Sequence, residues 1–150
     1  MKIIVQHTAI PENEVILRCP ALDEEMLGIL TLLRSGLQRL GVWDEARTLT
    51  LIAPDQVVYC DSVDDRVFVY TQQTIYHTAL SLGELESRYA SLGFVRIGRP
   101  VLVNLHHIRT LKSRPGGRVE ILLETGEKLM ASRHYAPPAA RAAGTVRLGP

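Results

Sequence analysis

Residues 93–112, GFVRIGRPVLVNLHHIRTLK, combine the apolar content of buried strands with a concentration of positive charge. Short apolar runs separated by Gly-Arg-Pro and by polar residues are typical of strands joined by turns. The segment contains no acidic residue. Its basic side chains and histidines are Arg96, Arg99, Arg109, Lys112, His106 and His107. A small, nearly neutral protein therefore places much of its positive charge on one strand-rich segment, and this placement needs a functional explanation.

The composition limits the classes of protein to be considered. With 150 residues, 46% apolar and 22% charged, the chain fits one soluble domain, or one domain with a small appendage. No window reaches the roughly 20 uninterrupted apolar residues of a membrane span, and the N-terminus lacks the layout of a secretory signal. Cys19 and Cys60 are too few for a disulfide scaffold and lack metal-ligand spacing. We therefore expect a cytoplasmic protein with two buried thiols.

Charge is distributed unevenly along the chain. Residues 1–47 carry 5 basic and 7 acidic side chains, residues 48–93 carry 2 and 6, and residues 94–150 carry 10 and 3. The last segment thus has a net charge of +7 and also holds three of the five histidines. One-sided charge of this kind favours a polyanionic partner. A solvated cationic face without a partner explains a bare charge asymmetry about equally well.

The first 47 residues predict a small ββα appendage. Residues 2–6 and 13–19 have the composition of short strands around a turn, and residues 23–40 that of an amphipathic helix. Asp23 can cap this helix and Gly41 can close it. The apolar stripe of the helix can cover the sheet of its own chain, which is the commoner outcome, or pair with a second copy. The loop at 41–48 is the expected domain boundary.

The rest of the chain predicts a mostly β, α+β fold with one short helix. That helix, residues 81–93, has a capping box at Ser81 and Glu84, and Gly93 ends it. The tail allows one helical turn near Ala139, and residues 141–150 are expected to be flexible. The predicted strands are residues 49–53, 57–60, 66–71, 74–80, 94–97, 100–104, 107–112, 117–124 and 127–132.

Catalytic and metal-binding patterns are weak. His106, His107 and His134 could join the acidic DSVDD loop around Asp61 only on paper, because neighbouring residues on a strand point to opposite faces. The sequence has no nucleophile elbow and no phosphate-binding glycine pattern. We therefore predict no cofactor, no metal, no small-molecule substrate and no enzymatic activity. A small enzyme using the His and Asp groups is the least favoured alternative.

Two stretches, FVRIGRPVLVNLHHIRTL at 94–111 and LETGEKLMASRHY at 123–135, resemble the LytTR DNA-binding domain of bacterial transcriptional regulators. The resemblance covers about residues 48–140 and implies an elongated, mostly antiparallel β fold that inserts loops into successive DNA grooves. The family's usual receiver domain has no counterpart in these residues, so the chain is similar to the short members with a small N-terminal appendage. The matching residues are Phe94, Arg96, Arg99, Val103, Asn104, Ile108, Gly126, Ser132, Arg133 and Tyr135.

The resemblance also implies which side chains contact DNA. The family's three main contact positions fall on or near Arg66, on Arg99 with Gly98 beside it, and on Arg133. Arginine suits each position, because it pairs bidentately with guanine or clamps a phosphate. Further candidate contacts are Arg96, Asn104, Lys112, Arg114 and His134, with Arg118 and Lys128 as candidate phosphate neighbours.

Competing structural roles exist for several of these residues. Arg66 follows two aspartates and could form an ion pair within its loop, and Arg96 could pair with an internal acid. Asn104 ends a strand, where hydrogen bonding to the backbone is the more common role. Pro100 stands where the family tends to have serine, so one backbone N–H donor for a phosphate is missing there.

Taken together, these patterns predict a transcriptional regulator that binds duplex DNA as a homodimer on paired repeats. Residues 1–47 would form an oligomerisation or input module, and residues 48–140 the DNA-binding domain. Short family members often work with a small membrane protein that restrains them, and the acidic appendage is a candidate docking surface for one. The alternative is a protein-interaction or anti-regulator module on the same fold.

Overall fold

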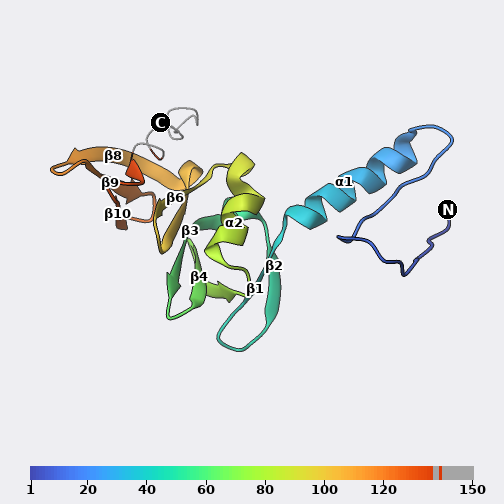
Figure 1. Ribbon diagram of the computed structural model, residues 1–150, viewed down its shortest axis with the longest axis horizontal. Coiled ribbons are helices and arrows are strands. Elements are labelled where there is room, and N and C mark those ends of the chain that lie inside the picture. The colour runs from blue at the N-terminus through green and yellow to red at the C-terminus, as the bar shows by residue number, and fades with distance from the viewer. Residues whose placement is uncertain (137–138, 140–150) are drawn as a thin grey trace. The chain divides into compact units, whose positions relative to one another are not determined.

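The computed structural model describes residues 1–136 and residue 139, apart from the side chains of residues 35 and 37. The chain divides into two compact units, Met1–Leu37 and Gln38–Pro150 (Figure 1). Within the described part of the chain, no helix is both long and apolar enough to cross a membrane. The predicted flexible tail at 141–150 lies outside the described residues.

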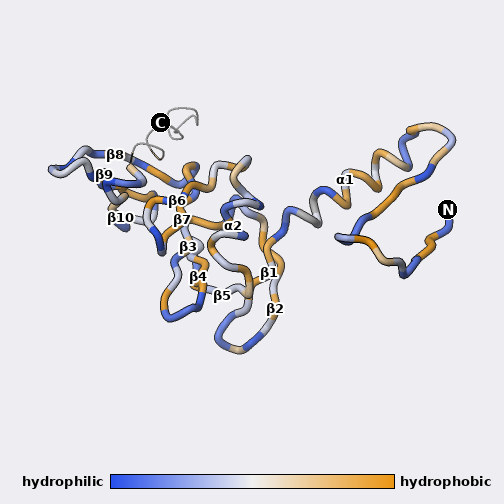
Figure 2. Tube along the Cα trace, in the orientation of Figure 1, coloured by the Kyte–Doolittle hydropathy of each residue, from blue (hydrophilic) through white to orange (hydrophobic). Residues whose placement is uncertain are grey.

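The first unit contains one helix, α1 (Glu24–Gln38), preceded by extended chain with a bend at Pro11 and Glu12. The two strands predicted at 2–6 and 13–19 are wrong, because residues 1–23 form neither helix nor strand. Two isolated strands are marginal in water unless other elements cover them. Figure 2 shows hydrophobic stretches along this part of the chain, and Ile3 is 89% exposed.

The start of α1 follows the prediction. The Asp23 carboxylate accepts a hydrogen bond from the backbone N–H of Met26 at 3.0 Å, which satisfies one of the free donors at the helix start. Met26 is buried, whereas Leu27 and Leu32 are exposed. The first unit therefore covers only part of its own apolar surface. Cys19 is also exposed, which corrects the prediction of two buried thiols.

The end of α1 differs from the prediction. Leu40 shares the helical spacing of the stripe, yet it begins strand β1 (Leu40–Trp43) and pairs with Ile52 of β2 (Leu49–Ile52). Both Leu40 and Ile52 are buried. Pairing within the sheet thus overrides the local helical pattern, and part of the predicted 41–48 loop is strand.

The second unit is built on a seven-stranded antiparallel sheet with the strand order β2-β1-β5-β4-β3-β7-β6. Every strand predicted for this sheet is present, and β4 has the predicted bounds. Thr71 and Thr74 close the predicted β4–β5 hairpin with a backbone hydrogen bond of 3.0 Å. The remaining strands are β3 (Val57–Val63), β4 (Arg66–Thr71), β5 (Ile75–Thr78), β6 (Phe94–Gly98) and β7 (Val101–Asn104).

A second, three-stranded sheet has the order β10-β9-β8. Its strands are β8 (Ile108–Arg114), β9 (Arg118–Leu123) and β10 (Lys128–Ala131). Short 3-10 turns precede β3, β6 and β8, namely η1 (Pro54–Gln56), η2 (Ala90–Leu92) and η3 (Leu105–His107). The described chain is therefore mostly antiparallel β structure with few helices, which confirms the predicted fold class.

Helix α2 (Leu82–Tyr89) has the predicted capping box. The Ser81 hydroxyl accepts a hydrogen bond from the Glu84 N–H at 3.1 Å, and the Glu84 carboxylate accepts one from the Ser81 N–H. Leu85 and Tyr89 are each 1% exposed. Gly93 ends the following turn with φ of 95°, a conformation that glycine adopts at low cost.

The large sheet has a core on each face. On one face α2 packs against residues such as Val69 and Leu102, and Cys60 is buried there as predicted. On the other face the small sheet packs against Tyr59, Ile97 and Val103 of β3, β6 and β7. Burial raises the pKa of the Cys60 thiol to about 12, and the neighbouring Asp61 adds to the shift.

The small sheet covers only part of the large one. On the β2-β1-β5 part of that face, Leu49, Leu51 and Ile75 are 55%, 58% and 53% exposed. Trp43 of β1 stacks on His77 of β5 there, with ring centroids 6.0 Å apart and an interplanar angle of 21°. Among the described residues of the second unit, this part of the sheet therefore remains uncovered.

Candidate nucleic-acid interface

Arg99 lies at the tip of the β6–β7 hairpin. Gly98 pairs with Val101, so Arg99 and Pro100 form a two-residue connection, and both are exposed. Arg96 supports this connection from the strand below, because its guanidinium Nη1 donates to the Arg99 carbonyl at 2.7 Å. The Arg99 side chain is thereby presented from a turn whose backbone is held in place.

Arg96 has two internal partners and is only 18% exposed in its side chain. Besides the Arg99 carbonyl, its Nε lies 3.6 Å from a carboxylate oxygen of Glu86 on α2. Glu86 is therefore the internal acid that the sequence analysis offered as an alternative partner for Arg96. Arg96 joins α2 to the turn that carries Arg99, which is a positioning role.

Arg66 begins β4 directly after the Asp64-Asp65 turn. Both aspartates have positive φ, at 51° and 62°, as the turns of tight hairpins require. Arg66 is exposed, and none of the ion pairs recorded among the described residues includes it. The ion pair between Arg66 and the preceding aspartates, which the sequence analysis gave as the alternative to DNA contact, is therefore not formed in this conformation.

The β3–β4 hairpin is tied to the Arg99 turn. The Ser62 N–H donates to the Pro100 carbonyl at 2.8 Å, and Ser62 pairs with Val67, next to Arg66. Although Pro100 has no N–H, its carbonyl makes the connection between the two loops. Figure 1 shows the β3–β4 connection and the end of β6 as neighbours in the second unit.

Arg133 lies in the turn that follows β10. The Ser132 N–H donates to the Ile97 carbonyl at 3.0 Å, so this turn is fastened to β6 just before Gly98. Arg133 is exposed, and its Cγ would lie 3.1 Å from a Cβ placed on Gly117, in the β8–β9 turn. Gly117 has φ of 75° and leaves room for the arginine stem.

Two backbone hydrogen bonds thus bring together loops that are far apart in sequence. We call these loops the arginine loops. Each bears an exposed arginine, and none of the three arginines has a recorded acidic partner among the described residues. An unneutralised guanidinium is available for phosphate or guanine. The arginine loops are residues 64–66, 98–100 and 132–134.

The outward face of the small sheet adds further positive charge. Lys112 pairs with Glu120, and Arg114 donates to the Glu120 carboxylate at 2.9 Å. The hydrogen bond from Arg114 lowers the pKa of Glu120, and the charges of Arg114, Lys128 and Lys112 lower it further. Three cations therefore surround one acid, so this face keeps a positive excess beside the Arg133 turn.

Asn104 has a structural position. Its side chain is buried, its amide donates to the Val57 carbonyl at 2.9 Å, and its carbonyl accepts from the His106 N–H at 3.1 Å. It therefore joins the end of β7 to the start of β3. His134, in contrast, is exposed beside Arg133 and packs edge-on against Tyr135 at 5.3 Å.

The histidine pair at 106 and 107 lies in η3 rather than at the start of a strand. The His107 Nε2 lies 2.6 Å from the Asp55 carbonyl, and its Nδ1 lies 3.3 Å from the Glu124 carboxylate. His107 therefore joins η1 to the end of β9. Among the described residues, no group of three or more His, Cys, Asp or Glu side chains is arranged to hold a metal.

Sequence reasoning missed a polar cluster between the two sheets. The rings of Tyr59 and Tyr70 stack at 4.1 Å, the Tyr59 hydroxyl donates to Glu127, and the Tyr70 hydroxyl donates to Asp61 at 3.2 Å. The second Asp61 oxygen is buried without a partner. Burial, and then the Glu127 charge, raise the pKa of Asp61, while the Tyr70 hydrogen bond opposes the rise. The register of β3 and β4, together with the position of Glu127 in the β9–β10 turn, assembles this cluster.

Comparisons with known proteins agree with the fold and with the matched motifs. The family model of the LytTr DNA-binding domain matches residues 47–142. Two curated proteins named Sensory transduction protein LytT, from Bacillus cereus and Bacillus anthracis, are each 28% identical over 89 residues. The match covers 59% of this chain and 36% of each relative, so the chain spans about a third of their length.

A solved structure shares the fold. It is the LytTr DNA-binding domain of a methyl-accepting/DNA response regulator from Bacillus cereus, which superposes with a TM-score of 0.67. The superposition covers 71% of this chain and 97% of that chain at 20% sequence identity. This likeness concerns the arrangement of the strands and helices.

Proposed function

The chain belongs to the LytTR family of DNA-binding domains, and from this premise we propose that it is a cytoplasmic transcriptional regulator that binds specific duplex DNA through the arginine loops. One observation carries the proposal: two backbone hydrogen bonds, Ser62 to Pro100 and Ser132 to Ile97, hold Arg66, Arg99 and Arg133 on adjoining loops. Side chains presented from fixed turns lose less freedom on binding.

The chemistry of these positions supports a division of work. Arg66, Arg99 and Arg133 can pair with guanine edges or clamp phosphates, while Gly98 lets the backbone approach closely. Lys112, Arg114 and His134 would contribute phosphate contacts, which supply most of the salt-dependent affinity. Arg96 and Asn104 would act as positioning residues, because both are bonded within the fold.

Selection from a random-sequence duplex pool tests the proposal. A regulator of this kind should enrich a pair of similar half-sites. Affinity for the selected site should fall steeply with salt, with a log–log slope of about −0.9 for each phosphate neutralised. Recovery of no preferred sequence would contradict specific recognition.

Arginine variants locate the surface on that selected site. Arg99→Ala and Arg133→Ala should each weaken the binding free energy for the selected site by about 1–3 kcal/mol. The loss for random-sequence DNA should be smaller. Arg47→Ala is the matched control, since it removes the same charge from the exposed β1–β2 turn at the other edge of the sheet order. Equal losses in all three variants would mean that only net charge matters.

We further propose that the chain binds paired half-sites as a homodimer and that its first residues form the oligomerisation or input module, which a small membrane protein could also dock against. A chain lacking residues 1–37 tests this part. It should still bind one half-site but lose the preference for two. Unchanged assembly and regulation would contradict it.

One observation favours the alternative, a protein-interaction module. The uncovered part of the large sheet presents Leu49, Leu51 and Ile75, which are all more than half exposed. Contiguous exposed apolar surface often marks a protein contact. If DNA selection gave no enrichment while charged substitutions at Leu49 and Leu51 abolished regulation, this alternative would replace DNA recognition.

A further inference from the structure

Residues 13–19, Asn-Glu-Val-Ile-Leu-Arg-Cys, are extended chain without a strand partner. Val15 and Ile16 are 71% and 65% exposed, and Leu17 is 38% exposed. Within residues 1–20, all of which the structure describes, no backbone hydrogen bond is recorded. The segment therefore has backbone N–H and C=O groups that could pair with another strand, and it has exposed β-branched side chains.

The charges of this segment are self-complementary. Glu14 and Arg18 lie at equal distances on either side of Ile16. In an antiparallel pair of two identical segments centred on Ile16, Glu14 of each copy stands opposite Arg18 of the other. Opposite charges directly across a strand pair are stabilising, and a two-fold axis produces two such ion pairs in one dimer.

We propose that residues 14–18 pair antiparallel with the same residues of a second copy of this chain, with Ile16 on the two-fold axis. This inference rests on the homodimer proposed above and identifies its interface. Val15 then stands opposite Leu17 of the other copy on one face. Ile16 meets its own counterpart on the other face, between the two ion pairs.

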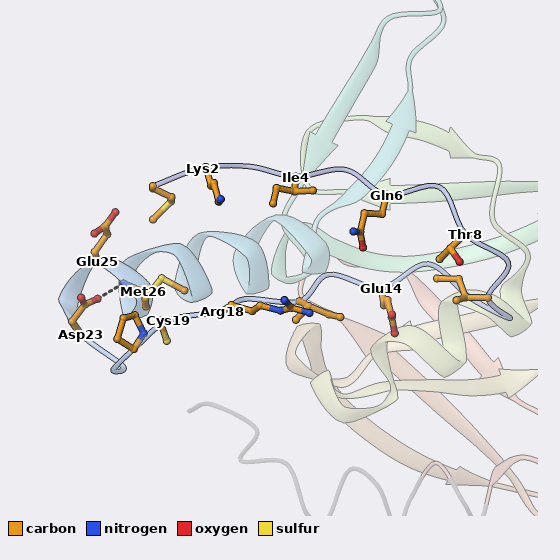
Figure 3. Close-up of a pocket in the computed structure, with 14 residues that line it drawn as sticks. Lys2, Ile4, Gln6, Thr8, Glu14, Arg18, Cys19, Asp23, Glu25 and Met26 are labelled. Atoms are coloured by element: carbon orange, nitrogen blue, oxygen red, sulfur yellow. Dashed lines mark hydrogen bonds between the residues drawn. The ribbon is translucent and has the colours of Figure 1, made fainter.

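Residues 2–8 of the same chain do not supply opposite charges for Glu14 and Arg18. Residues 2–8 run along one side of a hollow in the first unit, and after the bend at Pro11 and Glu12 residues 14–19 run back along the other side (Figure 3). Lys2 lies toward the Arg18 end, and the uncharged Gln6 and Thr8 lie toward Glu14. Residues 2–8 contain no acidic side chain, so folding back within one chain gives Arg18 no opposite charge from this segment, whereas pairing between copies brings opposite charges together.

The alternation of side chains also fits. Glu14, Ile16 and Arg18 line the hollow together with Ile4 and Met26. A second copy would add its own Ile16 to this apolar surface, while Val15 and Leu17 form the opposite face. The pairing therefore buries apolar surface on both sides of the new two-stranded ribbon.

Cysteine cross-linking tests the register. In a Cys19→Ser background, Ile16→Cys should give a disulfide-linked dimer under mild oxidation, because directly opposed antiparallel residues have Cα atoms about 4.5–5.5 Å apart. The native Cys19 is the control. Its counterpart would lie about 20 Å away in this register, so the unaltered chain should cross-link poorly. Efficient linkage through Cys19 with none at position 16 would overturn the proposed pairing.

Charge reversal provides an independent test by sedimentation of the free protein. Glu14→Arg and Arg18→Glu should each weaken dimerisation by roughly tenfold, since each places two like-charge pairs in the interface. The double variant Glu14→Arg/Arg18→Glu should restore it. A dimer that resists both single changes would overturn the proposal and indicate pairing through α1 instead.

The same variants separate this inference from the proposed function. If Arg18→Glu gives a monomer that still binds one selected half-site, both proposals hold. If the unaltered chain is monomeric and binds half-sites normally, the interface is wrong and DNA recognition stands. If the chain dimerises through Ile16 but selects no DNA sequence, the interface stands and the proposed function fails.

Discussion

The two units of the chain treat apolar sequence in opposite ways. In the second unit, Val42, Val69 and Leu102 lie in paired strands and are fully buried. In the first unit, Ile3 and Ile16 belong to runs of similar composition, yet both are largely exposed. The comparison shows that apolar, β-branched sequence supplies a tendency, and that a neighbouring strand and a covering layer turn it into a strand.

The largest expected effect comes from removing a buried side chain of the second unit. Leu102→Ala should lower the free energy of unfolding by about 2–5 kcal/mol, because it leaves a cavity under α2. The matched change Leu32→Ala, at a residue 74% exposed in α1, should alter it by less than about 0.5 kcal/mol. Urea unfolding followed by circular dichroism measures both. Similar losses in the two variants would remove the contrast between the units.

The next effect concerns a buried polar residue. Asn104→Ala should cost about 1–3 kcal/mol, since it leaves the Val57 carbonyl without its donor. Asn13→Ala, at an exposed position of the first unit, is the control and should be nearly neutral. The same urea measurement applies. A neutral result at Asn104 would mean that water replaces the amide.

A smaller effect should depend on pH. The pKa of Asp61 is raised, chiefly by burial, above its ordinary value of 3.8. Folding is therefore penalised where Asp61 is ionised in both states, and the penalty disappears as the pH falls through the folded pKa toward 3.8. Asp61→Asn removes this titration. The stability of the variant relative to the unaltered chain should be higher at neutral pH than near pH 3.8.

A second variant sharpens the pH test. The Tyr70 hydroxyl opposes the rise in the Asp61 pKa, so Tyr70→Phe should increase the penalty at neutral pH while leaving the acid limit less affected. Urea unfolding at several pH values measures both variants. If the stability difference between Asp61→Asn and the unaltered chain does not change with pH, the pKa of Asp61 is not raised on folding.

The smallest expected effect is on the second unit when the first is removed. A chain that begins at Gln38 keeps the Gln38 carbonyl, which accepts the Tyr89 hydroxyl at 2.8 Å. Its free energy of unfolding, measured with urea, should therefore change by no more than about 0.5 kcal/mol. Loss of cooperative unfolding would show that the sheet needs residues 1–37, contrary to the division into two units.

Much of the second unit could be predicted because its signals are local. Ser81 and Glu84 fix the start of α2, Gly93 marks the turn after it, and Thr71 to Thr74 form a hairpin. The errors fall where local pattern and pairing disagree. Leu40 continues a helical spacing but is paired with Ile52, an interaction that only the folded sheet reveals.

The candidate site was predicted only in part. The loops bearing Arg66, Arg99 and Arg133 follow from the family resemblance, and their contact with DNA stays a prediction. The bonds from Ser62 to Pro100 and from Ser132 to Ile97 could not be predicted, because each joins strands whose mutual register no local pattern encodes. The same reason hid Glu86 as the partner of Arg96.

Trp43 gives the protein a built-in optical reporter. It is the only tryptophan of the chain, and its ring rests on His77 where β1 meets β5. Indole fluorescence is sensitive to solvent and to a neighbouring imidazole, so the emission follows this junction alone. Because β1 begins just after the first unit ends, the fluorescence of the unlabelled protein can show whether an event in residues 1–37 is transmitted to the sheet.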